Sequence, residues 1–150
     1  MYSKDELKLL KKDFWEGFGI DCSNHPVLGK RKSKFMLYNT KMKGVELKFD
    51  ANREGAFVIL ELNNPKEEDR LKRYEQFEKY KAVMEENFPE GLIWDFAYKL
   101  ETGHEVCRIY SQKTGIDIHK RIHWMEFYTF MASEMLKLEK AFRYVKEAVE

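Results

Sequence analysis

The sequence predicts an α+β fold, with a five-stranded antiparallel or mixed sheet, three helices and the order αβββαββα. Apolar residues recur every three or four positions near both ends of the chain, which is typical of amphipathic helices. Between those ends, alternating and nearly continuous apolar runs indicate strands. The 150 residues suit a single domain, 1–150, and we expect the long C-terminal helix to pack on the sheet.

The first predicted helix runs from about Lys4 to Phe18. Ser3 and Glu6 have the spacing of a capping box, in which each side chain accepts a hydrogen bond from the other residue's backbone N–H. Leu7, Leu10 and Phe14 begin its buried stripe. We expect the glycines at 17 and 19 to end this helix.

Three strands are predicted next, at 35–38, 45–50 and 56–62. Asn64 then has the position of a helix N-cap, with Pro65 as the first helical residue, so a second helix is expected to about residue 88. Two further strands, 92–99 and 105–111, precede a last helix over about 120–148.

The last predicted helix carries a heptad seam of apolar residues. The simpler interpretation is that this seam is buried against the sheet of the same chain. The alternative is a helix that pairs with a second copy, which would make the protein a homodimer. The residues that would form that interface are Trp124, Tyr128, Met131, Met135, Leu138 and Phe142.

A pair of acidic residues is expected on the polar face of the central hairpin. If Ala51 and Ala56 close that hairpin, Glu46 lies opposite Glu61. Such a pair could hold a divalent metal that activates water, as in nucleases of the PD-(D/E)xK superfamily, whose strand order the chain is similar to. The lysine of that motif is replaced by Asn63, although Lys48 on the same face could substitute. The ordinary alternative is a pair of solvent-side carboxylates.

A basic stretch without acidic residues lies between positions 30 and 43. It could bind the phosphates of a nucleic acid, with salt-sensitive affinity that does not depend on sequence. It could equally be a solvated edge strand whose lysines prevent aggregation. Its basic residues are Lys30, Arg31, Lys32, Lys34, Lys41 and Lys43.

A weaker metal hypothesis concerns His119, His123 and Glu126. These residues would share one helix face if the last helix already included His119, and they could then ligate zinc. Isolated histidine pairs of this spacing are also common at helix starts. We therefore assign no metal ligands from the sequence, apart from the possible divalent site at Glu46 and Glu61.

Composition limits the remaining function classes. The chain has 27 basic and 26 acidic residues, so its net charge of +1 gives no overall attraction to DNA or membranes. No apolar run reaches the ~20 residues that span a bilayer, and no membrane partner is expected. Two cysteines make no disulfide framework, which favours a cytoplasmic location.

The whole chain resembles a bacterial family of unknown function, domain-of-unknown-function family 4268. The resemblance rests on structural-looking residues, including Phe14-Trp15, Gln76-Phe77-Glu78, Trp94, Arg108-Ile109-Tyr110 and Trp124. Members look like stand-alone proteins or C-terminal attachments to larger proteins, some of them nuclease-related. The resemblance implies no activity and no catalytic residues.

Three function classes follow from these features. The leading hypothesis is a non-catalytic or catalytically degenerate nuclease-like module that associates with nucleic acid or with a protein that processes it. The second is an interaction protein that dimerises through the last helix. The third is an active metal-dependent nuclease, in which Glu46, Glu61 and Lys48 would be catalytic.

Overall fold

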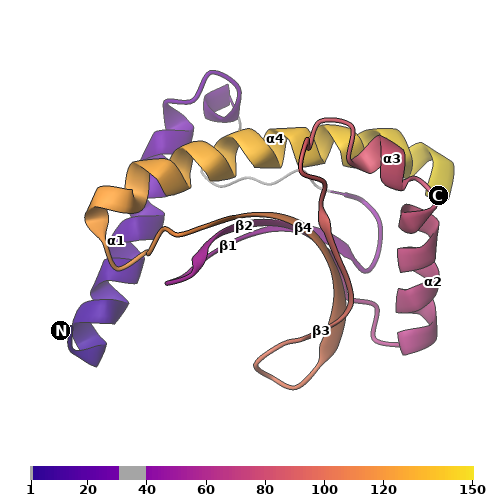
Figure 1. Ribbon diagram of the computed structural model, residues 1–150, viewed down its shortest axis with the longest axis horizontal. Helices are drawn as coiled ribbons and strands as arrows, with labels where there is room; N and C mark the ends of the chain where they lie inside the picture. The colour runs from indigo at the N-terminus through magenta and orange to yellow at the C-terminus, as the bar shows by residue number, and fades with distance from the viewer. Residues whose placement is uncertain (1, 31–39) are drawn as a thin grey trace. The chain divides into compact units, whose positions relative to one another are not determined.

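The structure is a computed structural model that describes residues 2–30 and 40–150. Its helices are α1 (Lys4–Ser23), α2 (Glu67–Glu78), α3 (Lys81–Met84) and α4 (Trp124–Val149), with 3₁₀ turns at Leu28–Lys30 and Arg121–His123. Its strands are β1 (Val45–Ala51), β2 (Gly55–Leu62), β3 (Ile93–Lys99) and β4 (Glu105–Thr114). The α+β class and the long C-terminal helix are therefore confirmed (Figure 1).

The described strands form one antiparallel sheet in the order β1-β2-β4-β3. The expected number of five strands was wrong for the described residues, which form four. The predicted strand at 35–38 lies outside the described residues. The predicted number of three helices was also wrong, because the second helix is interrupted at Lys79 and Tyr80 and continues as α3.

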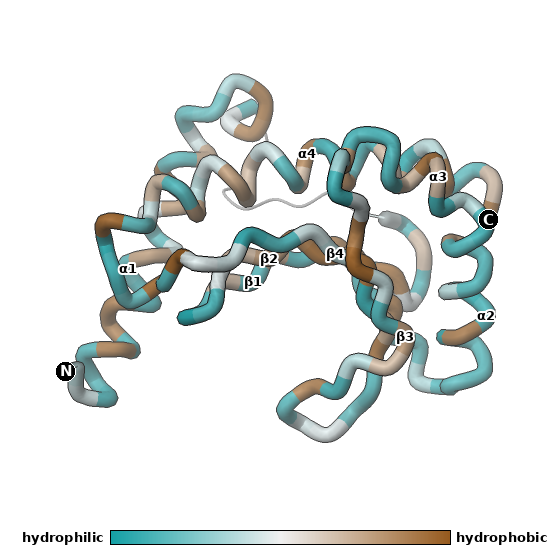
Figure 2. The backbone as a smooth tube through the Cα atoms, viewed as in Figure 1, coloured by the Kyte–Doolittle hydropathy of each residue, from teal (hydrophilic) through white to brown (hydrophobic). Residues whose placement is uncertain are grey.

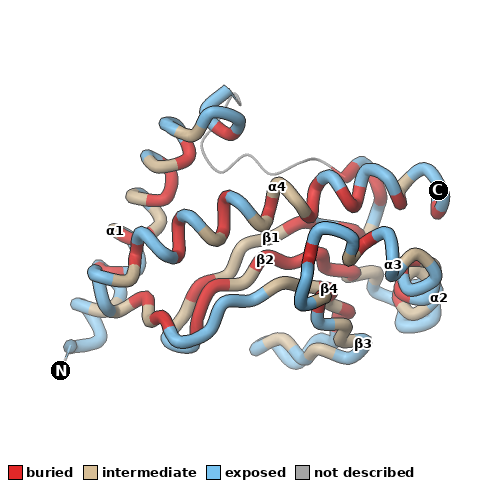
Figure 3. The backbone as a smooth tube through the Cα atoms, turned by 45° about the horizontal axis from the view of Figure 1, so that its top comes forward, coloured by how far each residue is buried: buried red, intermediate tan, exposed pale blue. Residues whose placement is uncertain are grey.

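Hydrogen bonds at both ends of the β1–β2 hairpin fix its register. The backbone N–H of Asn63 donates to the Gly44 carbonyl at 2.8 Å, and the N–H of Asn52 donates to the Gly55 carbonyl at 3.0 Å. Both bonds fit the predicted alignment, in which Glu46 faces Glu61. The apolar side of the hairpin is buried, including Leu47 and Leu60. The red segments of β1 and β2 in Figure 3 show this burial.

Three helix boundaries differ from the sequence-based prediction. The first helix continues to Ser23, because Gly17 lies against the Tyr128 side chain within the helix rather than ending it. The second begins after Lys66 instead of Asn64, whose carbonyl accepts a hydrogen bond from Arg70. The last begins at Trp124, because the preceding residues form a 3₁₀ turn.

Contacts divide the chain into two compact units. Of the described residues, unit 1 comprises 2–30, 50–57 and 112–133, and unit 2 comprises 40–49, 58–111 and 134–150. The core of unit 1 is aromatic: the Phe14 ring contacts those of Trp124, Phe127 and Tyr128. The Tyr128 hydroxyl also donates to the Phe14 carbonyl at 2.8 Å.

Unit 2 contains the polar face on which the acidic pair was predicted. Its core includes the stacked rings of Phe77 in α2 and Phe142 in α4. Apolar and polar segments alternate along both helices, as Figure 2 shows by colour. The apolar sides of these elements are thus used for packing, and the charged side chains of β1, β2 and β4 are left on the other face of the strands.

Candidate functional site

Glu46 and Glu61 do come together on the hairpin, but a lysine lies between them. The Lys48 ammonium is 2.6 Å from the Oε2 atom of Glu61 and 3.3 Å from the Oε2 atom of Glu46. Glu61 is almost completely buried, with 1% of its side chain exposed, whereas the Glu46 side chain is 54% exposed. Opposed carboxylates repel each other. Here the positive charge between the two carboxylates is supplied by Lys48 of the same chain.

Arg108 of β4 satisfies the second oxygen of Glu61. Its Nε and Nη2 atoms each lie 3.1 Å from Glu61 Oε1. The guanidinium is also stacked over the Tyr98 ring, 4.1 Å from the ring centroid. Asn63, which occupies the position of the nuclease lysine, donates weakly to Glu61 Oε2 at 3.4 Å. We call Glu46, Lys48, Glu61, Asn63 and Arg108 the Glu61 cluster.

The charges in the Glu61 cluster stabilise one another. Burial lowers the pKa of Lys48, but hydrogen bonds and charge attraction from Glu61 and then Glu46 outweigh that effect and leave the pKa raised. Both carboxylate oxygens of Glu61 already accept hydrogen bonds from cationic groups. A metal ion bound by Glu61 would have to displace Lys48 or Arg108. The cluster therefore has the chemistry of an internal ion pair network.

The weaker zinc hypothesis fails because its three residues do not share a helix face. His119 precedes the 3₁₀ turn, and α4 begins after His123. The Nδ1 atom of His123 accepts a hydrogen bond from the backbone of Asp117, and Glu126 lies 3.9 Å from the Lys113 ammonium. Within residues 2–30 and 40–150, no three His, Cys, Asp or Glu side chains gather closely enough to hold a metal ion.

The predicted basic stretch is only partly described. Arg31, Lys32 and Lys34 lie outside the described residues. Lys30 belongs to unit 1, Lys41 and Lys43 belong to unit 2, and all three are exposed. Binding of nucleic acid by this stretch stays a prediction.

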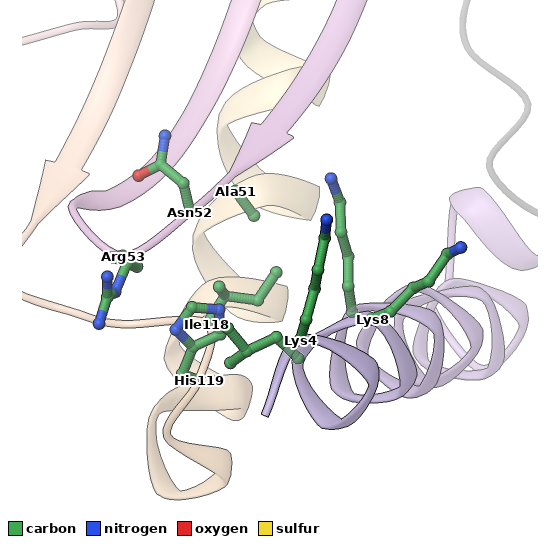
Figure 4. A pocket seen from close by; sticks show the side chains of 9 residues that line it. Lys4, Lys8, Ala51, Asn52, Arg53, Ile118 and His119 are labelled. Atoms are coloured by element: carbon green, nitrogen blue, oxygen red, sulfur yellow. The ribbon is translucent and has the colours of Figure 1, made fainter. Parts of the chain in front are cut away.

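A second group of basic residues surrounds a cavity of about 420 Å³ in unit 1 (Figure 4). We call this cavity the basic hollow. It lies between α1, the turn that joins β1 to β2, and the segment before α4. Its lining comprises Lys4, Leu7, Lys8, Lys11, Ala51, Asn52, Arg53, Ile118 and His119.

The positive charges of the basic hollow, unlike those of the Glu61 cluster, are not paired with carboxylates of the lining. No acidic residue is among those that line it. In the part of the chain that the structure describes, Lys4, Lys8, Lys11 and Arg53 make no ion pair. The Nδ1 atom of His119 lies 3.7 Å from the Asp117 carboxylate, which is an ion pair only when the imidazole is protonated. The hollow is therefore a concentrated positive site that an anion could neutralise.

Sequence reasoning missed this hollow, although α1 carried a signal. Lys4, Lys8 and Lys11 are spaced by four and three residues, which places them on one helix face. Arg53 and His119 could not have been added from the sequence, since only the folded chain brings them next to α1.

The six residues of the predicted dimer interface are all buried: Trp124, Tyr128, Met131, Met135, Leu138 and Phe142. They are buried within the chain, where Trp124 and Tyr128 contact the Phe14 ring of α1 and Phe142 stacks on Phe77 of α2. The exposed large apolar residues of α4 are instead Met125 and Tyr144. Formation of a homodimer stays a prediction. None of the described helices has the length and apolar character needed to cross a membrane.

Comparison with known protein families matches residues 10–146 to the family described as Domain of unknown function (DUF4268). The chain belongs to this family. The match confirms the family resemblance expected from the sequence. Comparisons with curated proteins and with solved structures gave no match.

Proposed function

We propose that this member of the family associates with nucleic acid through phosphate groups, without catalysing a reaction on it, and that the basic hollow is the contact site. The observation that carries the proposal is the gathering of four basic side chains and a histidine around one cavity with no acidic lining residue. Because the net charge of the chain is only +1, such a local concentration is what would attract a polyanion.

The contacts of the lysines also support phosphate binding. Lys4, Lys8 and Lys11 are exposed, so binding a phosphate would not require them to leave an internal partner in the described chain. Lysine binds phosphate as a point charge on a flexible stem, which suits a backbone of variable sequence. Such binding would release counterions and weaken steeply as salt rises.

The absence of catalysis in this proposal rests on the Glu61 cluster. In a nuclease of the PD-(D/E)xK type, the two acids must be available to a divalent ion. Here both oxygens of Glu61 already face Lys48 and Arg108. We therefore expect no nicking of supercoiled plasmid with magnesium or manganese. Nicking that disappears in Glu61→Gln would instead support the metal-dependent nuclease.

Fluorescence anisotropy of a labelled single-stranded oligonucleotide tests the proposal. We expect binding by the wild type that weakens at least about tenfold between about 50 and 200 mM salt. The Lys8→Glu variant should bind about tenfold more weakly, because it reverses a charge in the hollow.

Lys12→Glu is the matched control. Lys12 is an exposed lysine on the same helix, but it does not line the hollow. Its variant should bind within about twofold of the wild type, with the same change in net charge as Lys8→Glu. Equal losses in the two variants, or wild-type binding that salt does not affect, would overturn the proposal.

A further inference from the structure

The basic hollow differs from a flat phosphate-binding surface because its floor is lined by apolar side chains. Ala51 and Ile118 are 5% and 4% exposed, so they form the floor, together with the half-buried Leu7. Lys4, Lys8 and Arg53 are exposed and form part of the rim. Figure 4 shows Lys4 and Lys8 rising from α1 on one side, with Arg53 and His119 on the other. The ligand that fits this arrangement is apolar at one end and anionic at the other.

The size of the hollow suits one small molecule or one nucleotide, and it is too small for several consecutive nucleotides of a strand. Its volume of about 420 Å³ lies within the range of ~300–1,000 Å³ that holds small molecules. A single nucleotide has this scale. A nucleobase could cover the floor of Ala51 and Ile118, while the phosphate on the same nucleotide reaches the basic rim.

The charge of the rim favours a particular kind of phosphate. An internal phosphodiester carries a single negative charge, whereas a phosphate monoester carries about −1.5 to −2 at neutral pH. Three lysines and one arginine around a single cavity would gain more from the monoester. Asn52 adds a polar group to the lining. Its Oδ1 atom accepts from the backbone N–H groups of Glu54 and Gly55, which fixes the orientation of the amide.

We propose that the basic hollow binds the phosphorylated end of a nucleic acid strand, taking the terminal nucleotide with its phosphate monoester. This inference rests on the proposed function and makes it more specific, because it distinguishes strand ends from internal positions. The base is held by shape and apolar contact, so no sequence preference is expected. The phosphate is held by charge, so its ionisation and the salt concentration govern the affinity.

The test compares oligonucleotides of one sequence that differ only in their ends. Strands with a 5′-phosphate, a 3′-phosphate or hydroxyl groups at both ends compete against one internally labelled strand. We expect a phosphorylated end to strengthen binding about fivefold over the hydroxyl form. Lys8→Gln should remove that preference, whereas Lys12→Gln should keep it, since Lys12 does not line the hollow.

The outcomes separate this inference from the proposed function. Salt-dependent binding with no preference for phosphate at either end would overturn the end-binding site and leave the proposed function standing. No binding of any strand would overturn both. A nucleoside 5′-monophosphate is the remaining competitor. If it bound more tightly than the phosphorylated strand, the hollow would be a site for free nucleotides, and its assignment to strand ends would be wrong.

Discussion

The Glu61 cluster and the basic hollow use charged residues in opposite ways. In the cluster, each buried charge faces a partner: Glu61 contacts both Lys48 and Arg108 at hydrogen-bonding distance. In the hollow, Lys4 and Lys8 share a cavity with other basic groups and with no acid. A buried charge needs an oppositely charged or hydrogen-bonding partner within the chain, whereas an exposed charge is solvated by water and is available to a ligand. This difference fits a stabilising role for the Glu61 cluster and the proposed phosphate-binding role of the basic hollow.

The largest effect on this comparison should come from Glu61→Ala. The variant leaves Arg108, only 12% exposed, and Lys48 without their shared carboxylate. We expect the free energy of unfolding to fall by about 3–5 kcal/mol in urea denaturation. Glu46→Ala is the control, and because Glu46 is exposed it should cost under about 1 kcal/mol. Equal costs for the two variants would show that the cluster does not contribute as a buried network.

A packing change in unit 1 should have the next largest effect. A side chain at position 17 would clash with Tyr128, because a Cβ atom there would overlap the Tyr128 hydroxyl. We expect Gly17→Ala to lower the free energy of unfolding by about 1–3 kcal/mol, measured by thermal or urea denaturation. Glu16→Ala, at an exposed neighbouring position of α1, should change it by less than about 0.5 kcal/mol. If Gly17→Ala were as mild as Glu16→Ala, helix α1 would not depend on this contact.

Removing one lysine from each region separates their roles. Lys48→Met takes away a charged hydrogen-bond donor from Glu61, and we expect it to lower the free energy of unfolding by about 1.5 kcal/mol. Lys8→Met removes a charge that repels its neighbours, so stability should stay within about 0.5 kcal/mol or rise. Urea denaturation measures both values. Greater destabilisation by Lys8→Met than by Lys48→Met would reverse the comparison.

The smallest effect concerns alkaline pH. The pKa of Lys48 is raised in the folded chain above its ordinary value of 10.5. Its contribution to stability is therefore present below that ordinary value and is lost as pH rises through the raised folded pKa. Because Lys48 is 38% exposed, the loss should stay well under ~1.4 kcal/mol per pH unit.

Denaturation series of the wild type and Lys48→Met above about pH 10 measure this loss. The wild type should lose stability more steeply than Lys48→Met. Tyrosines with raised pKa values titrate in both proteins, including Tyr74 and Tyr128, each at about 12, so they do not affect the difference. If the free energy of unfolding fell equally with pH in both proteins, the ionisation of Lys48 would not contribute to stability.

Much of the fold could be predicted from local patterns. The alternation of β1 and the apolar run of β2 predicted both strands, and the capping box of Ser3 and Glu6 predicted the start of α1. Boundaries failed where tertiary contacts decide them. Gly17 remains helical because it packs on Tyr128, which is more than a hundred residues away in the sequence. Asn64 does not cap α2, and its backbone carbonyl accepts a hydrogen bond from the Arg70 side chain.

The residues of the candidate sites also fall into two groups: those that local sequence patterns could predict, and those that only tertiary contacts bring together. Pairing of Glu46 with Glu61 followed from the hairpin register, and Lys48 followed from its shared face. Arg108 could not be predicted, because no local pattern showed that β4 would lie next to β2. The basic hollow likewise depends on three segments distant in sequence, of which only α1 carried a local signal.

The salt dependence of binding tests most directly whether the uncompensated charges of the hollow contact phosphates. For single-stranded DNA, the logarithm of the binding constant falls with the logarithm of salt by ~0.7 for each phosphate contact. Replacing Lys4, Lys8 and Lys11 with glutamine removes the lysines around the terminal phosphate, so it should lower the magnitude of the slope by at least about 0.7 relative to the wild type. A slope unchanged by the triple replacement would contradict the account, because the phosphates would then be bound elsewhere on the chain.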